Sequence, residues 1–213
     1  MVERWETGIL MSKNLLIVFA KNIVLGKVKT RLAKSIGDNE ALNVYVKLYE
    51  ITERESLKVR NADLEVHFSD VIIEAKWASS NRYVQVEGNL GVKMKHAFEK
   101  GFEKGYKNII CIGTDLADQK AEIIENAFNQ LEKHDFVFGP AEDGGYYLVG
   151  SSQKQLYIFD NKPWSEDTLL KETLTEIKSF NHSVSLLNTL NDIDNLEDLK
   201  RSMLENEFKH LWN

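Results

Sequence analysis

The chain has 213 residues, of which 43% are hydrophobic, enough for a sizeable core and too apolar for a disordered chain. Its formal net charge of −6 argues against a general nucleic-acid binder, although local basic patches can still exist. The single cysteine excludes an internal disulfide framework and suits a reducing cytoplasm, and the five histidines never fall at zinc-ligand spacing.

The first ten residues differ in character from the rest of the chain. Residues 1–10 hold two glutamates and no long apolar stretch, so they do not read as a signal peptide. We expect a disordered extension there, followed by one domain over residues 11–213, because no repeat and no Pro-, Gly- or Ser-rich linker divides the chain. The apolar run at residues 15–20 is too short to span a membrane.

Strand-like and helix-like segments alternate from there on. Residues 14–20, NLLIVFA, form a continuous apolar run typical of a parallel strand buried on both faces. Residues 38–59 have helical periodicity with Asp38 as a plausible N-cap, and residues 64–69 alternate as a second strand. Residues 90–105 predict an amphipathic helix.

The second half of the chain continues this alternation. Strands are expected at residues 107–113, 134–140, 145–150 and 182–187. Helices are expected over about 15 residues from Lys120, around 166–180 and over 195–211. Together these elements predict a three-layer α/β fold with a mostly parallel sheet, in which ligands bind beyond the carboxyl ends of the strands.

The segment after the first strand is rich in cations. Residues 21–33 contain a glycine among Lys21, Lys27, Lys29 and Arg31. A glycine lets backbone N–H groups approach an anion, and Lys and Arg neutralise phosphate charge. The segment is not a Walker loop, because Gly26-Lys27 is followed by Val28. It fits either a phosphate-binding loop or a solvated basic loop.

Acidic residues follow later strands. Asp115 comes directly after an apolar strand, where carboxylates commonly hold Mg²⁺ or Mn²⁺ together with substrate phosphates. The alternative is an Asx-turn or N-cap. Asp192 and Asp194 are two residues apart and lie on one side if extended, but Asp194 with Glu197 also fits a variant capping box.

The segment GPAEDGGYYLVG, residues 139–150, places acids and glycines at the entry to a strand. Gly144 and Gly145 remove side chains where a substrate presses on the backbone, and Asp143 directs an acid into the same cleft. A tight hairpin turn explains the glycines equally well. Trp164 is either a pocket wall or a buried aromatic before a helix.

Five segments in this order resemble a family of bacterial glycosyltransferase-like proteins, DUF2064, also described as transferases associated with radical-SAM and selenocysteine-containing domains. They are FAKNIVLGKVKTRLA, GTDLADQ, GPAEDGGYYLVG, KPWSEDTLL and NDIDNLEDL. The resemblance covers roughly residues 13–200, with KTRL and DGGYYL as its specific parts. It implies the GT-A nucleotide-diphospho-sugar transferase fold.

The resemblance also implies roles for individual residues. The nucleotide-binding residues would be Lys21, Gly26, Lys29, Thr30 and Arg31. Asp115 and Asp194 would hold Mg²⁺ or Mn²⁺. The catalytic residues would be Asp143, Lys29 and Arg31, with Gly144, Gly145 and Trp164 on the substrate side. The chain departs from the family at Asn22, Val24, Leu116-Ala117 and Asn195-Leu196, where prolines are usual.

These features predict a metal-dependent transferase that uses a nucleotide-activated donor, with glycosyl transfer from a nucleoside-diphosphate sugar as the leading hypothesis. A nucleotidyltransferase that joins a nucleoside triphosphate to a phosphorylated acceptor is the alternative, and a non-catalytic nucleotide-binding module is a third. The expected partners are the donor and a small-molecule acceptor, without nucleic acid or a membrane span, in the cytoplasm.

Overall fold

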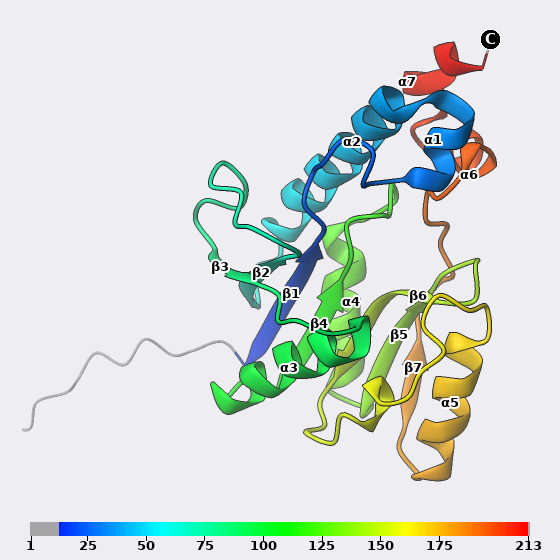
Figure 1. The fold of residues 1–213 in the computed structure, drawn as a ribbon. Coiled ribbons are helices and arrows are strands. Elements are labelled where there is room, and N and C mark those ends of the chain that lie inside the picture. Colours follow the sequence, from blue (N-terminus) through cyan, green and yellow to red (C-terminus); the bar gives the residue numbers. More distant parts are fainter. Residues whose placement is uncertain (1–12, 213) are drawn as a thin grey trace, which may run out of the picture.

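A seven-stranded sheet forms the middle of the protein (Figure 1). The strands are β1 (Asn14–Ala20), β2 (Asp63–Phe68), β3 (Asn81–Val84), β4 (Asn108–Ile112), β5 (Phe136–Pro140), β6 (Tyr146–Ser151) and β7 (Val184–Leu186). Their order is β3-β2-β1-β4-β6-β5-β7, and β6 alone runs antiparallel to its neighbours. This is a computed structural model that describes residues 13–212, so the expected extension at residues 1–10 lies outside the described part.

Helices connect the strands and cover both faces of the sheet. They are α1 (Thr30–Ile36), α2 (Asp38–Ser56), α3 (Leu90–Glu103), α4 (Ala121–Leu131), α5 (Leu169–Ser179), α6 (Leu196–Arg201) and α7 (Glu205–Phe208), with short 3₁₀ turns η1 (Tyr157–Phe159) and η2 (Lys209–Leu211). Within residues 13–212, none of these helices combines the length and apolarity needed to cross a bilayer.

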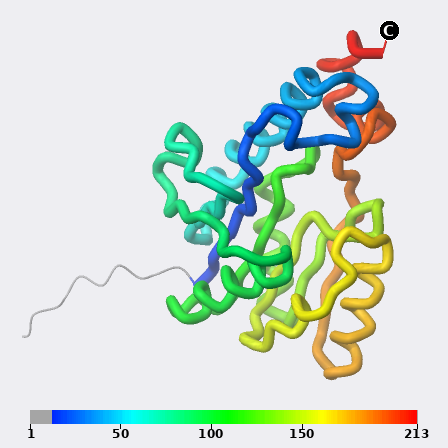
Figure 2. The backbone as a smooth tube through the Cα atoms, in the orientation of Figure 1, coloured from blue at the N-terminus to red at the C-terminus, as the bar shows by residue number. Residues whose placement is uncertain are grey.

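Two hydrophobic cores lie on opposite faces of the sheet. Leu16 and Val18 of β1 pack on the side of α2 and α4, whereas Leu15 and Ile17 pack on the side of α3. Successive residues of a strand point to opposite faces, so a continuous apolar run fills both cores. The three-layer α/β fold with a mostly parallel sheet is therefore confirmed, and the tube in Figure 2 follows its layers.

A third core lies beyond one end of the sheet. It joins α1, α2, α6 and α7 through buried side chains: Leu32, Leu48, Ile193, Leu199 and Phe208. Figure 1 shows α1, α6 and α7 together at the end to which β1 and β4 point. This core brings the C-terminal segment next to the carboxyl ends of the central strands.

The single helix expected over residues 195–211 is wrong. The helix α6 ends at Arg201, because Ser202 is extended and its hydroxyl bonds the carbonyl of Leu199. The capping box is also one residue later than expected, since Asn195 and Asp198 cap each other's backbone N–H groups. Asp194 is therefore outside the cap and available to the site.

Two elements were not expected from the sequence, and one cap was misplaced. The cationic segment after β1 ends in the helix α1, and the short edge strand β3 lies among polar residues without strong alternation. Gly37, with a φ of 83°, occupies the N-cap of α2, and Asp38 is the first helical residue.

Candidate functional site

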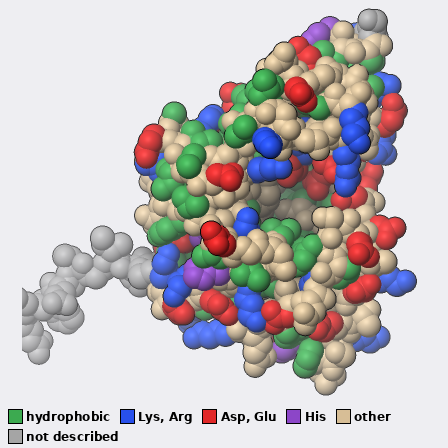
Figure 3. Space-filling model, in the orientation of Figure 1, with side chains coloured by type: hydrophobic (Ala, Val, Ile, Leu, Met, Phe, Trp, Pro, Cys, Tyr) green, Lys and Arg blue, Asp and Glu red, His purple; other side chains and the backbone are tan. Residues whose placement is uncertain are grey.

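The carboxyl ends of β1 and β4 open onto a cavity of about 360 Å³. Its walls are largely apolar and include Phe19, Met94, Tyr146, Tyr147 and Val149; its polar groups include Lys21, Ser69, Gln85, Lys93 and Asp115. Figure 3 shows the molecule hollowed in the middle of this face, with charged side chains above the hollow and hydrophobic ones on its lower wall. An apolar cavity with a few convergent polar groups is the usual form of a small-molecule site.

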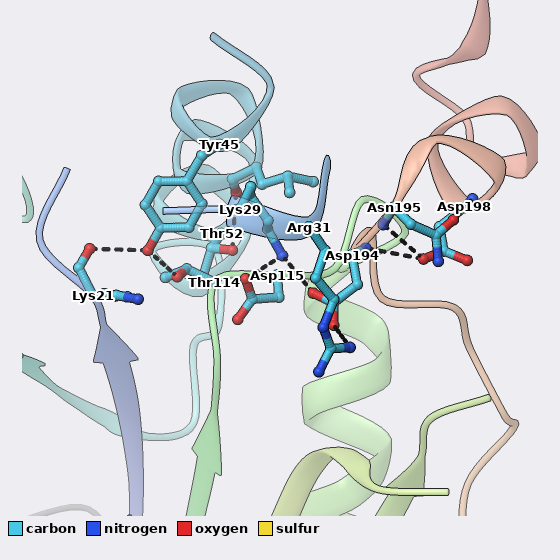
Figure 4. Close-up of polar contacts among 11 residues, drawn as sticks. Lys21, Lys29, Arg31, Tyr45, Thr52, Thr114, Asp115, Asp194, Asn195 and Asp198 are labelled. Atoms are coloured by element: carbon cyan, nitrogen blue, oxygen red, sulfur yellow. Dashed lines mark hydrogen bonds and ion pairs between the residues drawn. The ribbon is translucent and has the colours of Figure 1, made fainter. Parts of the chain in front are cut away.

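The ammonium group of Lys29 bridges two aspartates at one side of this cavity (Figure 4). Lys29 Nζ lies 2.5 Å from Asp115 Oδ1 and 3.4 Å from Asp194 Oδ1. The Lys29 side chain is 4% exposed. Burial works against its charge, but the attraction and hydrogen bond of Asp115, together with the charges of Asp194 and Asp192, outweigh it, so the pKa of Lys29 lies above its ordinary value.

Arg31 adds a second cation on the solvent side. Its guanidinium group lies 3.2 Å from Asp194 Oδ2, and its side chain is 68% exposed. Lys29, Arg31, Asp115 and Asp194, which the sequence selected from three separate segments, are therefore brought together.

Asp192 is a further member of this group, although it was not among the metal ligands expected from the sequence. Its Oδ1 atom is buried and has no hydrogen-bond partner among the described residues. Burial and the charge of Asp115 raise the pKa of Asp192 to about 7. Its spacing from Asp194 was the available signal, whereas the burial of its Oδ1 atom and its isolated β-bridge with Leu116 are tertiary effects.

A second, acidic pocket of about 210 Å³ is lined by two of these aspartates, Asp192 and Asp194. Its lining is formed by Arg31, Glu142, Asp143, Asn191, Asp192, Asp194, Asn195, Asp198 and Arg201. Asp143 therefore shares a pocket with Asp192 and Asp194. One of its oxygens accepts a hydrogen bond from the backbone N–H of Gly145, at 2.9 Å.

The donor set suits a hard divalent cation, although no ready-made cluster of three ligands is found in the described part of the chain. Carboxylate oxygens are what Mg²⁺ and Mn²⁺ prefer. Asp192 offers a buried oxygen without a partner, and Asp115 and Asp194 converge on one point. That point is taken by the ammonium of Lys29. The residues that would hold a cation are Asp115, Asp192 and Asp194.

Tyr45 of α2 fastens the two strand ends to each other, a role not expected from the sequence. Its hydroxyl lies 2.8 Å from Thr114 Oγ1 and donates to the carbonyl of Lys21 at 2.9 Å (Figure 4). Lys21 follows β1, and Thr114 precedes Asp115 after β4. These hydrogen bonds therefore fix the cationic loop that begins at Lys21 relative to the segment of Thr114 and Asp115.

The remaining nucleotide-binding candidates lie on the loop after β1 and at the start of α1. Gly26 has a φ of 71°, a conformation that favours glycine, and Thr30 is the first residue of α1. Asn22, where the family usually has a proline, is buried and holds the neighbouring loop by accepting from the N–H of Asp70 at 2.9 Å and donating to the carbonyl of Val71 at 2.8 Å. These hydrogen bonds connect the loop after β1 to the loop after β2.

Two of the three substrate-side candidates, Gly144 and Trp164, have packing roles. Gly144 has a φ of 89°, and a Cβ there would lie 2.0 Å from the carbonyl oxygen of Asp167. Trp164 packs behind Tyr146, with ring centroids 6.5 Å apart, and against Gly91. Neither the apolar cavity nor the acidic pocket is lined by Gly144, Gly145 or Trp164. Direct substrate contact by these residues stays a prediction.

Comparison with known proteins supports the fold and the family. The model of DUF2064, described as uncharacterized proteins conserved in bacteria, matches residues 54–166. A structure from Desulfovibrio desulfuricans G20, provisionally described as a nucleotide-diphospho-sugar transferase, is 28% identical with a TM-score of 0.85, over 94% of this chain and 97% of that chain. No curated protein matches the chain.

More distant structures share the fold. CMP:2-keto-3-deoxy-manno-octonic acid synthetase complexed with CTP has a TM-score of 0.57 at 9% identity, over 93% of this chain and 99% of that chain. Rv0371c from Mycobacterium tuberculosis H37Rv, in complex with manganese, has a TM-score of 0.55 at 13% identity, over 88% of this chain and 96% of that chain.

These likenesses show that the chain has a GT-A-like fold, shared with a 28%-identical structure that is provisionally described as a nucleotide-diphospho-sugar transferase and, at 9% identity, with a synthetase complexed with CTP. The family model also spans more than half of the chain. The chain therefore belongs to the DUF2064 family.

Proposed function

We propose that this enzyme transfers a glycosyl group from a nucleoside-diphosphate sugar to a small-molecule acceptor with the help of Mg²⁺ or Mn²⁺. The observation that carries the proposal is the convergence of Asp115 and Asp194 on the buried ammonium of Lys29, beside an apolar cavity of about 360 Å³. Such a site pairs oxygen ligands for a cation with positive charge for phosphates.

Each group has a distinct task in this reaction. The cavity wall of Phe19 and Met94 would enclose the nucleoside, with Lys21 near the diphosphate. Lys29 and Arg31 would neutralise charge that develops on the departing phosphate oxygens. When bound, the divalent cation supplies further stabilisation of that charge.

The acidic pocket supports a hydroxyl-bearing acceptor. Asp143 is exposed there, and the Gly145 N–H fixes the orientation of its carboxylate. A carboxylate in this place can take the proton of an attacking hydroxyl, which glycosyl transfer requires. The 28%-identical structure, provisionally described as a nucleotide-diphospho-sugar transferase, points the same way.

Nucleotidyl transfer is the second candidate, because the fold is shared with a synthetase complexed with CTP. That reaction needs no general base when the acceptor is already a phosphate, so Asp143 would be dispensable. Lys29 and Arg31 would then contribute most of the stabilisation of the transferred phosphoryl group.

The cytoplasm, where either type of donor is available, is the compartment that we propose.

A ligand screen tests the function. The unfolding temperature of the wild type and of Asp115→Asn is measured with nucleoside triphosphates and nucleotide sugars, with and without Mn²⁺. A donor at 100 times its Kd should stabilise the wild type by about 2.7 kcal/mol. We expect the Mn²⁺-dependent part of this stabilisation to disappear in Asp115→Asn.

The product then separates the two reactions. Release of a nucleoside diphosphate indicates glycosyl transfer, whereas release of pyrophosphate indicates nucleotidyl transfer. Asp143→Asn should lower kcat by at least about 100-fold in the first case and leave it nearly unchanged in the second. Absence of stabilisation by every nucleotide and nucleotide sugar would contradict both.

A further inference from the structure

We propose that the ammonium of Lys29 holds the place of the divalent cation between Asp115 and Asp194, and that binding of the cation displaces Lys29 and frees it for the phosphates of the donor. The inference rests on the proposed function, because it assumes that the site takes a divalent cation. It adds that the Lys29 ammonium and the divalent cation compete for the carboxylates of Asp115 and Asp194, which the proposed function by itself does not require.

The contacts of Lys29 show that its ammonium occupies the position between Asp115 and Asp194. Its Nζ atom lies 2.5 Å from Asp115 Oδ1 and 3.4 Å from Asp194 Oδ1, the oxygens that converge on it in Figure 4. The side chain is 4% exposed, so water contributes little to its solvation. The ammonium has therefore replaced its hydration shell by these carboxylates.

Charge and space argue that a cation and this ammonium exclude each other. A bound Mg²⁺ ion lies about 2.1 Å from its carboxylate oxygens. On Asp115 Oδ1 it would share one oxygen with an ammonium at 2.5 Å, so the two positive charges would lie close together beside the buried Lys29 side chain and repel each other. The nearby Asp192 Oδ1, buried and without a partner among the described residues, is a third oxygen for which Lys29 supplies no hydrogen bond.

The backbone of Lys29 supports a role outside local structure. Lys29 is the N-cap of α1 in the left-handed region, at φ 47° and ψ 43°, and its side chain makes no capping bond. A non-glycine residue there is strained, and such strain concentrates at functional sites. The helix is anchored instead by the buried neighbours Val28 and Leu32. Removing the ammonium should therefore leave α1 in place.

The decisive experiment measures Mn²⁺ affinity, which reads the competition directly and does not depend on turnover. Free Mn²⁺ is followed by electron paramagnetic resonance during titration of the wild type, Lys29→Met and Asp115→Asn, without nucleotide. Methionine keeps an unbranched side chain, one heavy atom shorter than lysine, and removes its charge. We expect Lys29→Met to bind Mn²⁺ at least tenfold more tightly than the wild type, and Asp115→Asn to bind it at least tenfold more weakly.

Lys34→Met is the matched control. Lys34 lies in the last turn of the same helix, is exposed and makes no ion pair within residues 13–212, so this variant changes the net charge equally. Its Mn²⁺ affinity should equal that of the wild type. An equal gain of Mn²⁺ affinity in Lys34→Met would show that the effect of Lys29→Met comes from the change in net charge alone, and it would overturn the inference.

A measurement on the wild type covers the case in which Lys29→Met folds poorly. Acetylation of individual lysines by an amine-reactive reagent is followed by mass spectrometry with and without saturating Mn²⁺. Lys29 should be protected without the cation and at least threefold more reactive with it, while Lys34 should not change. A reactivity of Lys29 that stays constant or falls would overturn the inference.

The outcomes separate this inference from the proposed function. If the wild type binds Mn²⁺ but Lys29→Met binds it no more tightly, the displacement is wrong and the metal-dependent function stands. If neither protein binds Mn²⁺ with or without a nucleotide, the metal-dependent function fails and the displacement fails with it.

Discussion

Single side chains at this site act on more than one segment of the chain. Lys29 connects α1 to Asp115 and Asp194, and Tyr45 connects the end of β1 to the end of β4. Burial and the charge of Asp115 raise the pKa of Tyr45, so its hydroxyl stays protonated and remains a donor. The geometry of the site therefore depends on hydrogen bonds that a residue's own neighbours in the chain do not supply.

Two tyrosines on α2 allow a matched test of this support. Tyr45→Phe removes a hydroxyl with two partners, and we expect a loss of about 1–2 kcal/mol in the free energy of unfolding, measured by urea denaturation. Tyr49→Phe removes a buried hydroxyl that has no hydrogen-bond partner among the described residues, so its effect should be near zero or stabilising. Equal losses in both variants would show that the Tyr45 bonds contribute nothing specific.

At the scale of elements, the sheet edge formed by β7 is held by a carboxylate that precedes β5. Asp135 Oδ2 accepts hydrogen bonds from both the backbone N–H and the hydroxyl of Ser183, each at 2.7 Å. Burial works against the charged form, but these bonds, together with the interactions of His182 and Gln153, outweigh it, and the pKa of Asp135 lies below its ordinary value. The short strand β7 thus gains a clamp at its start.

This clamp predicts a pH dependence. Because the pKa of Asp135 is lowered in the folded protein, its contribution is fully present above the unfolded value of about 3.9 and is lost as the pH falls through the folded value. Asp135→Ala should unfold with about 1–3 kcal/mol less free energy at pH 7. The difference from the wild type should shrink below about pH 4.

A control for the clamp is Asp160→Ala, which removes an aspartate paired with Lys95 on the surface at 2.7 Å. Exposed ion pairs contribute less than about 1 kcal/mol, so this variant should stay close to the wild type in urea at pH 7. A loss for Asp135→Ala that persists undiminished at low pH would show that packing, rather than charge, explains it.

At the scale of the molecule, the C-terminal segment completes the site from the far end of the chain. Ile193 is fully buried in the third core, between Asp192 and Asp194, and its N–H donates to the carbonyl of Asp115 at 3.2 Å. The packing of α6 and α7 against α1 and α2 therefore sets where these two aspartates stand.

Two isoleucines separate this positioning effect from general stability. Ile193→Ala and Ile158→Ala each empty a fully buried position, and each should lower the free energy of unfolding by about 2–5 kcal/mol. Ile158 lies in the core on the α3 side of the sheet. Mn²⁺ affinity, measured well below both unfolding temperatures, should fall in Ile193→Ala and stay unchanged in Ile158→Ala. Equal affinities in the two variants would contradict the positioning role.

Much of the fold follows from local pattern. The apolar run of β1 and the periodicity of α2 and α3 were sufficient to place these elements within a few residues, because each pattern reflects burial on one or both faces. The edge strand β3 was not predicted, because its largely exposed residues show little hydrophobic alternation. The break between α6 and α7 was not predicted either, because it depends on hydrogen bonds of the Ser202 side chain rather than on hydrophobic periodicity.

The sequence by itself determined the chemistry of the loops: cations after β1, Asp115 after β4 and aspartates near the C-terminus. Only the tertiary structure decided that Lys29 meets Asp194 across 165 residues of chain, and that Asp192 Oδ1 is buried without a hydrogen-bond partner among the described residues. The physical reason is that strand order and the third core bring distant segments together. Burial then shifts the pKa of a charged group, and neither effect is visible in the spacing of residues along the chain.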